Sequence, residues 1–591
     1  MGQSEAQPQP DGAARAFHYR GPALPTTDHD RDREPAAGAN PALPPKRDAA
    51  IAQLELLMIT ATSRVLLSGS FRVWAIAAAI LLSACPVSAV ELRRVQQTTL
   101  DGVLEGTLSA DGSTRSFKGI PYAAPPVGRL RWKPPQPVAP WTNVRSAVEF
   151  GARPMQGRIF DDMVFHDAGP SEDCLYLNLW LPEKRAPKLP VMVWLYGGGL
   201  VAGSTSEPRQ DGANLASKGV LLVSLNYRLG VFGFLAHPEL TRESAQHASG
   251  NYGLLDMIAA LEWVRRNISA FGGDPENVTI FGESAGAAAV NALMASPRAR
   301  GLFQRAIAES GTIFRPNRPL QTRAEAEIAG AKFAGELGAT SLEALRAIPA
   351  DQLLAATLKE PRPRFSTIID GWVLPADARS IFGTGQQALV PLLAGWNRDE
   401  DGVRPLFGSE EPSLASLAVR ARALFGDQAN DFQRLYAAAT DAEAQRVAKD
   451  YGTDERVGYA TWKWLELHRT TGGAPVYRYA FEHTLPLAAD APKGTEPVAP
   501  HAGEIEFVFR TLGSRKLAWR TEDRAVSELM ASYWTNFAKT GNPNQASLPK
   551  WDAHDPEHGF AVMHFRAGRA AAASDAQRGR YQFLDRRAMG P

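Results

Sequence analysis

One short segment constrains the fold of this 591-residue chain more than any other feature. Residues 278–281 (VTIF) form an apolar run typical of a buried strand, and a helix-like run of small residues follows at 287–295. Between the two stands the sequence GESAG at 282–286. After a strand and before a helix, this G-x-S-x-G pattern makes a sharp turn that lifts its serine above the sheet edge. We therefore predict that Ser284 is a nucleophile rather than part of an ordinary Gly/Ser turn.

A serine hydroxyl needs a base before it can attack, and in this kind of turn the chain order is serine, acid, histidine. Of the six histidines that follow Ser284, His501 stands in a loop rich in Pro, Ala and Gly (PVAPHAGEIEF), where a rigid frame can present an imidazole. We predict that His501 is the base, with His483 as the alternative. The remaining four lie in a helix end, a strand or a charged segment: His468, His554, His558 and His564.

The acid that orients the base is expected between Ser284 and His501. Residues 391–401 (PLLAGWNRDED) form an apolar run that ends in an acidic turn, at the required place in the chain order. A carboxylate at this point can hold the imidazole and stabilise its cationic form. The residues alone do not distinguish Asp399, Glu400 and Asp401.

A glycine run supplies candidate donors for an oxyanion. The strand-like residues 191–195 lead into Tyr196 and three glycines at 197–199, and glycine lets a backbone approach a ligand closely. The residue after a nucleophile of this type, Ala285, adds a further backbone N–H. The spacing of the glycines excludes a G-x-G-x-x-G nucleotide fingerprint.

Alternating strand and helix patterns predict an α/β fold with a mostly parallel central sheet flanked by helices. Short apolar runs at 191–195, 220–225 and 278–281 are typical of buried strands, and residues 254–266 carry a helical apolar stripe. Segments 324–333 and 414–436 predict further helices, inserted over the sheet. We expect one domain from residue 90 to 591.

Composition excludes several other classes of protein. The 64 basic and 63 acidic residues leave a net charge of +1, which is not the footprint of a nucleic-acid-binding protein. Two cysteines are too few for a disulfide-dense scaffold or a multi-cysteine zinc site. We therefore expect no nucleic acid, metal or other cofactor.

The first 89 residues have a different character from the rest. Residues 1–57 are rich in proline, which predicts a disordered or untranslated extension, with translation starting at Met58. Residues 58–89 combine two arginines, the apolar run VWAIAAAILLSA and the small-residue site VSA, which is typical of an export signal and too short for a membrane span. The sequence LSAC also offers a lipid site at Cys85, so an exported protein is expected, periplasmic or extracellular, with a lipid anchor as the alternative.

Several motifs together resemble one known family. They include FKGIPYAAPPVGRLRW (117–132), SEDCLYLNLW (171–180), LNYRLGVFGFL (225–235), NYGLLDMIAALEWVRRNISAFGGDPENVTIFGESAG (251–286), AESG (308–311), DGWVLP (370–375) and FAKTGNPN (537–544). Their order and content are similar to the carboxylesterase/cholinesterase (type-B carboxylesterase) family over about residues 106 to 551. The resemblance implies an α/β-hydrolase fold with helical insertions over an active-site gorge.

The resemblance also assigns roles to individual residues. The family's acid lies in a G-x-N-x-x-E motif, which here ends at Glu400, and its histidine opens an H-x-x-E-[IL] motif at His501. Asp401 stands where a glycine usually follows the acid, which keeps it as the alternative. The implied oxyanion donors are Gly198, Gly199 and Ala285; the resemblance further implies that Glu283 lines the gorge floor and that Ser310 is a hydrogen-bonding partner of the triad.

Two departures from the family pattern concern one loop. Cys174 usually pairs with an upstream cysteine, but Pro154 or Met155 stands there, so we expect a free, buried thiol. The tryptophan with which cholinesterases bind a quaternary ammonium is absent from residues 151–173, which disfavours a choline-ester specialist.

The function implied is that of a secreted serine carboxylesterase that hydrolyses a small-molecule ester through an acyl-enzyme. The alternatives are an amidase or carbamate hydrolase of the same fold, and an inactive family member that acts as a binding protein. The sequence does not identify the ester or the oligomeric state.

Overall fold

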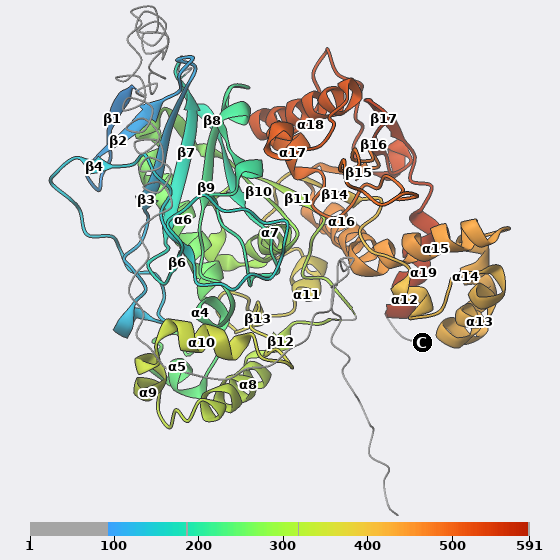
Figure 1. The fold of residues 1–591 in the computed structure, drawn as a ribbon, viewed down its shortest axis with the longest axis horizontal. Coiled ribbons are helices and arrows are strands. Elements are labelled where there is room, and N and C mark those ends of the chain that lie inside the picture. The colour runs from blue at the N-terminus through green and yellow to red at the C-terminus, as the bar shows by residue number, and fades with distance from the viewer. Residues whose placement is uncertain (1–92, 185–186, 317, 589–591) are drawn as a thin grey trace, which may run out of the picture. The chain divides into compact units, whose positions relative to one another are not determined.

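The computed structural model describes residues 93–184, 187–316 and 318–588. The predicted extension 1–57, the signal 58–89 and Cys85 lie outside the described residues. Within them, a 13-stranded sheet runs through the molecule, and helices flank it (Figure 1). In sheet order its strands are β1 (Arg94–Thr98), β2 (Val103–Leu108), β3 (Thr114–Pro121), β7 (Tyr176–Pro182), β9 (Leu221–Leu225), β8 (Leu189–Leu195), β10 (Gly273–Glu283), β11 (Arg305–Glu309), β14 (Leu392–Asn397), β15 (Val476–Phe481), β16 (Val562–Arg566) and β17 (Arg569–Ala573), with β4 (Arg145–Ser146) paired to β2.

The centre of this sheet is parallel and its two edges are antiparallel. From β9 to β16 every neighbouring pair is parallel, whereas the pairs on either side are antiparallel. The central strands β8 and β9 are almost entirely buried, as expected for strands covered on both faces. The prediction of a mostly parallel α/β sheet is therefore confirmed. Two short two-stranded sheets pair β5 (Arg153–Pro154) with β6 (Pro170–Ser171) and β12 (Gln321–Thr322) with β13 (Ile368–Ile369).

Helices occupy the connections between the central strands. Helix α6 (Tyr252–Asn267) precedes β10, and α7 (Ala285–Ala295) follows it. On the sheet, the ring of Trp194 lies 4.8 Å from Phe281 and 4.9 Å from Phe509 of α17 (Ile505–Phe509), so α17 is anchored by aromatic packing. The other helices outside the insertions are α3 (Ala213–Ala216), α4 (Gly230–Phe234), α5 (Pro238–Glu243), α18 (Thr521–Thr540) and α19 (Arg578–Ala588).

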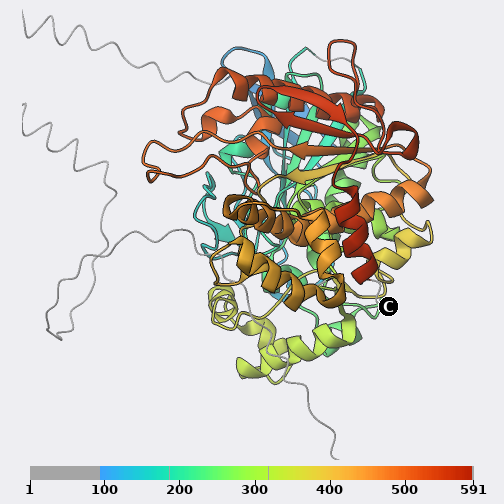
Figure 2. The ribbon, with the colours of Figure 1, turned by 90° about the vertical axis from the view of Figure 1, so that its right-hand side faces the viewer.

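Two helical insertions interrupt the strand order. One lies between β11 and β14, and its helices α8 (Arg323–Glu336), α9 (Leu342–Ala347) and α10 (Ala350–Thr357) lie at the lower left of Figure 1; the other lies between β14 and β15. In Figure 2 the orange helices of the second insertion lie below the red C-terminal strands. The first also contains α11 (Ala378–Gly383); the second contains α12 (Arg404–Phe407), α13 (Leu414–Phe425), α14 (Ala429–Leu435), α15 (Asp441–Thr453) and α16 (Tyr459–Gly472).

The structure corrects one predicted helix. Residues 414–436 do not form a single helix: α13 ends at Phe425, a 3₁₀ turn covers Gly426–Gln428, and α14 begins at Ala429. Gly426 has φ 54° and donates its N–H to the carbonyl of Arg422, which is how a glycine commonly ends a helix. In the part of the chain that the structure describes, no helix is long and apolar enough to span a membrane.

Candidate active site

The turn that carries Ser284 is a strained connection between β10 and α7. Ser284 has φ 54° and ψ −117°, which is unusual for a residue with a side chain. A methyl group on either Gly282 or Gly286 would clash with the carbonyl oxygen of Leu195 in the neighbouring strand β8. The two glycines therefore let strand and helix approach closely enough to form the turn, and Ser284 stands at the carboxyl end of β10.

Three side chains from different parts of the chain form one series of hydrogen bonds. The Oγ of Ser284 lies 2.9 Å from Nε2 of His501, and Nδ1 of His501 lies 2.6 Å from Oε2 of Glu400. The His501 side chain is 25% exposed, whereas that of Glu400 is fully buried. Solvent and substrate can therefore reach the imidazole, while its carboxylate partner is shielded.

Buried polar groups hold Glu400 in its ionised form. Its Oε1 accepts a hydrogen bond of 2.8 Å from the backbone N–H of Asn397, and its own N–H donates to Oγ1 of Thr453 at 3.1 Å. Burial by itself raises the pKa of Glu400, but His501, Arg456 and Ser310 together hold the pKa below its ordinary value. An ionised carboxylate against Nδ1 leaves Nε2 of His501 free to accept a proton.

The neighbouring acids of the same turn have other partners. Asp399 pairs with Arg398 at 2.8 Å and with Arg446 at 2.6 Å. Asp401 lies 3.8 Å from Arg456. Of the three acids that the residues alone left open, the structure thus brings only Glu400 to His501.

A second carboxyl group lies against the same imidazole. Oε1 of Glu283 is 3.4 Å from Nε2 of His501, and the side chain is almost completely buried. Burial and the nearby Glu504 raise the pKa of Glu283 well above its ordinary value. This environment therefore favours the uncharged form of Glu283 beside Ser284.

Ser310 lies behind this series, in contact with a glutamate that the sequence analysis did not single out. The hydroxyl of Ser310 donates to Oε1 of Glu504 at 3.2 Å, and Nδ2 of Asn397 donates to Oε2 of Glu504 at 2.5 Å. Burial and the charge of Glu400 raise the pKa of Glu504 to about 8. Asn397 and Glu504 could have been found in the sequence, since Asn397 is the Asn of the G-x-N-x-x-E motif and Glu504 is the Glu of the H-x-x-E-[IL] motif.

The glycine run after β8 adopts backbone conformations that favour glycine. Gly198 has φ 104° and Gly199 has φ 66°. A side chain at Gly197 would collide with Glu283 and contact Ser284, so the run passes directly beside Ser284. Ala285 is the first residue of α7, whose N-terminal N–H groups favour negative charge at this point.

The alternative histidine belongs to a different cluster. Nε2 of His483 lies 2.6 Å from Asp523, and Asp523 also pairs with Arg520 at 2.7 Å. With Glu522, His483 and Asp523 form the one group among the described residues whose spacing could hold a metal ion. Because Arg520 already neutralises Asp523, this donor set does not favour a cation.

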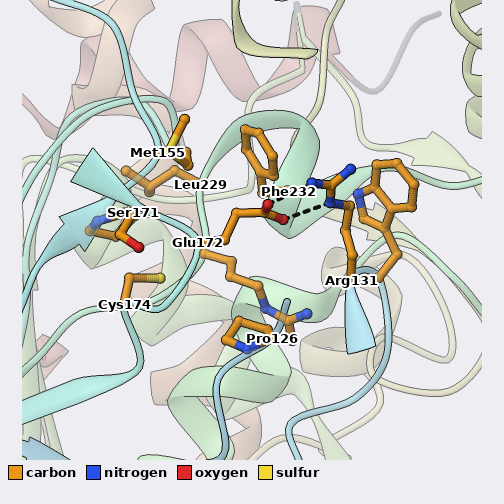
Figure 3. A pocket seen from close by; sticks show the side chains of 11 residues that line it. Pro126, Arg131, Met155, Ser171, Glu172, Cys174, Leu229 and Phe232 are labelled. Carbon is orange, nitrogen blue, oxygen red and sulfur yellow. Dashed lines mark hydrogen bonds and ion pairs between the residues drawn. The ribbon is translucent and has the colours of Figure 1, made fainter. Parts of the chain in front are cut away.

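Cys174 is a free, buried thiol, as predicted. Figure 3 shows it beside a small cavity that is also lined by Met155 and Pro154, the residues that stand where the family usually has the partner cysteine. Nearby, Arg131 and Glu172 form an ion pair of 2.5 Å that closes another side of this cavity (Figure 3). Cys174 thus lies beside Met155 and Pro154 without a disulfide.

A sharp turn at Ser284 after a parallel strand, with His501 and Glu400 hydrogen-bonded to it in series, is the arrangement typical of the α/β-hydrolase fold and of serine hydrolases. The chain matches the model of the carboxylesterase family over residues 91–584, and it belongs to that family. The prediction of a carboxylic-ester hydrolase of this class is thereby confirmed.

Individual relatives agree with the family match. The chain is 38% identical to fumonisin B1 esterase of Sphingopyxis macrogoltabida, over 79% of this chain and 86% of the relative. It is 37% identical to para-nitrobenzyl esterase of Bacillus subtilis (strain 168), over 78% of this chain and 92% of the relative. A solved structure of a PNB esterase superposes with a TM-score of 0.67 at 34% identity, covering 83% of this chain and 99% of that chain.

Proposed function

We propose that the protein hydrolyses carboxylic esters with Ser284 as nucleophile, His501 as general base and acid, and Glu400 as the acid that orients His501. The observation that carries this proposal is the position of His501, whose two nitrogens lie 2.9 Å from Ser284 Oγ and 2.6 Å from Glu400. This is the geometry in which a base can take the serine proton and a carboxylate can stabilise the resulting cation.

The reaction proceeds in two half-steps. Oγ of Ser284 bonds to the carbonyl carbon of the ester while its proton passes to Nε2 of His501, and the backbone N–H groups of Gly198, Gly199 and Ala285 stabilise the oxyanion. His501 then gives the proton to the leaving alkoxide oxygen as the carbon–oxygen bond breaks, which leaves an acyl-enzyme. Water repeats the sequence and releases the acid.

Labelling and substitution at Ser284 test the proposal. An organophosphate should label one serine, Ser284, and Ser284→Ala should lose both the label and at least about four orders of magnitude in kcat on p-nitrophenyl acetate. Ser413→Ala is a matched control, because Ser413 caps helix α13 and takes no part in the site. A wild-type protein that neither labels nor turns over esters would contradict the proposal and favour a binding protein.

We further propose that residues 58–89 direct export of the enzyme, with cleavage after Ala89 or lipid attachment at Cys85. The support is the sequence pattern of positive flank, apolar run and small residues. Expression of the full chain, followed by cell fractionation and N-terminal sequencing, tests this. Cys85→Ala should leave release unchanged if cleavage follows Ala89, and should abolish membrane attachment if Cys85 carries a lipid. Retention of residues 58–89 in a cytoplasmic product would refute export.

A further inference from the structure

Arg315 is an inward-lying arginine without an acidic partner among the described residues. The residue is only partly exposed, and its buried Nε has no hydrogen-bond partner. Other buried arginines are paired: Arg228 lies 2.7 Å from Asp256, and Arg209 lies 2.7 Å from Glu207. Burying a charge without a partner costs free energy, so a guanidinium in this position would be stabilised by a bound anion.

The loop that carries Arg315 begins beside the nucleophile. Gly311 packs so closely on the carbonyl group of Ser284 that a side chain would not fit there. Asn291 of α7 then accepts hydrogen bonds from Oγ1 of Thr312 at 2.9 Å and from the N–H of Ile313 at 3.2 Å. These contacts fix the loop on the helix that starts at Ser284, and Arg315 follows two residues after Ile313.

Other arginines add positive charge to the same place. Arg456, in the π-helical segment Asp454–Gly458, lies 3.8 Å from Asp401, the residue next to Glu400. Arg364 donates to Oγ of Ser366 at 3.3 Å and to the carbonyl of Pro319 at 3.5 Å, without an acidic partner among the described ion pairs. Burial, together with Arg456, Arg318 and Arg364, lowers the pKa of Arg315 to about 10. Arg315 thus remains charged at neutral pH among positive neighbours, whose effect the charge of Glu400 offsets only in part.

The chemistry of the guanidinium selects the kind of ligand. Its planar fork of N–H donors matches the two oxygens of a carboxylate, and such charge-assisted hydrogen bonds are stronger than neutral ones. Asp401 neutralises part of Arg456, whereas no acid of the described residues forms an ion pair with Arg315, on which the charge of Glu400 acts without direct contact. A carboxylate on the substrate would supply the missing partner.

We propose that Arg315, assisted by Arg456 and Arg364, binds a carboxylate group of the substrate, so that the enzyme prefers esters that carry a free carboxylate away from the scissile bond. This inference rests on the proposed esterase function and adds a substrate class to it. Arg315 is a specificity residue in this scheme, because it acts on a part of the substrate that does not react.

Two matched pairs of substrates test the preference and locate the carboxylate. Ethyl hydrogen adipate and the ethyl ester of adipic monoamide differ only in a charge on the acyl side; the acetate esters of 6-hydroxyhexanoate and 6-hydroxyhexanamide differ in the same way on the alcohol side. We expect kcat/KM to be roughly ten- to a hundredfold higher for the carboxylate member of one pair, which is the range of a charged hydrogen bond. Equal kcat/KM values within both pairs would overturn the inference.

Variants assign the preference to Arg315. Arg315→Gln should bring the ratio of kcat/KM between the carboxylate and amide members close to one, and Arg456→Gln should reduce this ratio by a smaller factor because Arg456 is paired with Asp401. Arg434→Gln is the control, since Arg434 is 69% exposed and pairs with Asp431 in α14. An Arg315→Gln enzyme that keeps the full preference would refute the assignment.

If Arg315→Gln does not fold, inhibition of the wild-type enzyme still tests the inference. The adipate dianion should inhibit p-nitrophenyl acetate hydrolysis with a Ki at least about tenfold lower than that of adipamide. Equal Ki values would overturn the inference while the hydrolysis itself upholds the proposed function. If p-nitrophenyl acetate and all four esters are left intact, the proposed function fails, and the carboxylate preference fails with it.

Discussion

The molecule contains two histidine–carboxylate pairs of the same length that stand in different surroundings. His501 lies 2.6 Å from Glu400, and His483 lies 2.6 Å from Asp523. The side chain of His501 is 25% exposed and its other nitrogen faces Ser284, whereas that of His483 is 2% exposed. Asp523 is moreover shared with Arg520.

This contrast shows that a short histidine–carboxylate hydrogen bond does not by itself make a catalytic site. The pair becomes a base only where its second nitrogen reaches a nucleophile and where substrate can enter. His483 is buried and Asp523 is shared with Arg520, so this pair instead connects the segment after β15 to the start of α18 and stabilises the fold.

The largest expected effect comes from exchanging the two histidines for alanine, one at a time. His501→Ala should lower kcat on p-nitrophenyl acetate by about four to six orders of magnitude, because the serine loses its base. His483→Ala should keep kcat within a few-fold and lower the melting temperature instead. Steady-state kinetics and thermal denaturation of both variants measure this. A His501→Ala enzyme with near-wild-type kcat would eliminate His501 as the base.

The next effect distinguishes the acid of the site from its sequence neighbour. Glu400→Gln should reduce kcat by about three to four orders of magnitude, since the imidazole loses the charge that stabilises its cation. Asp401→Asn should change kcat by no more than about threefold, because its contact with Arg456 is partly exposed. Kinetics at pH 8 with equal amounts of folded protein make the comparison, and the opposite ranking would transfer the role to Asp401.

The central part of the fold and of the candidate site could be predicted from the sequence. Apolar runs predict the buried strands. Gly282 and Gly286 predict the turn at Ser284, because the close approach of β8 and α7 leaves no room for a side chain at either position. Chain order and loop composition pointed to His501. The choice of Glu400 among three acids needed the family motif, because burial and contact with an imidazole are properties of the folded chain.

Other features could not be read from local patterns. Apolar residues recur at helical spacing on both sides of Gly426. Helix α13 nevertheless ends there, because Gly426 adopts a positive φ. The unpaired state of Arg315 depends on which acids fold near it, and the contact of Glu504 with Ser310 joins residues 194 positions apart. Such long-range electrostatics have no signature in a single sequence.

A further variant tests the contribution of the His483–Asp523 pair to stability, with no expected effect on catalysis. Asp523→Asn leaves Arg520 and His483 without their carboxylate, and it also weakens the hydrogen bond from the Arg520 N–H at the start of α18. We expect the free energy of unfolding to fall by about 2 kcal/mol, mainly because the buried His483 loses its carboxylate partner, whereas Arg520 is partly exposed. Denaturation with urea measures the loss, while kcat should stay within a few-fold. A large loss of kcat in a fully folded variant would show that the two pairs are coupled.

The smallest effect concerns Glu504, the buried carboxyl group that contacts Ser310 and Asn397. The pKa of Glu504 is raised from 4.5 to about 8, by burial first and then by the charge of Glu400. A group whose pKa is raised on folding contributes stability that is complete below pH 4.5 and is lost as the pH rises through 8.

Glu504→Gln removes this dependence and can still donate to Ser310 and accept from Asn397. The melting temperature of the variant, relative to the wild type, should therefore increase by a few degrees between pH 5 and pH 9. Thermal denaturation at four or five pH values follows the trend, with Glu522→Gln as an exposed control. A difference that is flat over this range would mean that Glu504 is already ionised at pH 5, and that the site holds its negative charge on both Glu400 and Glu504.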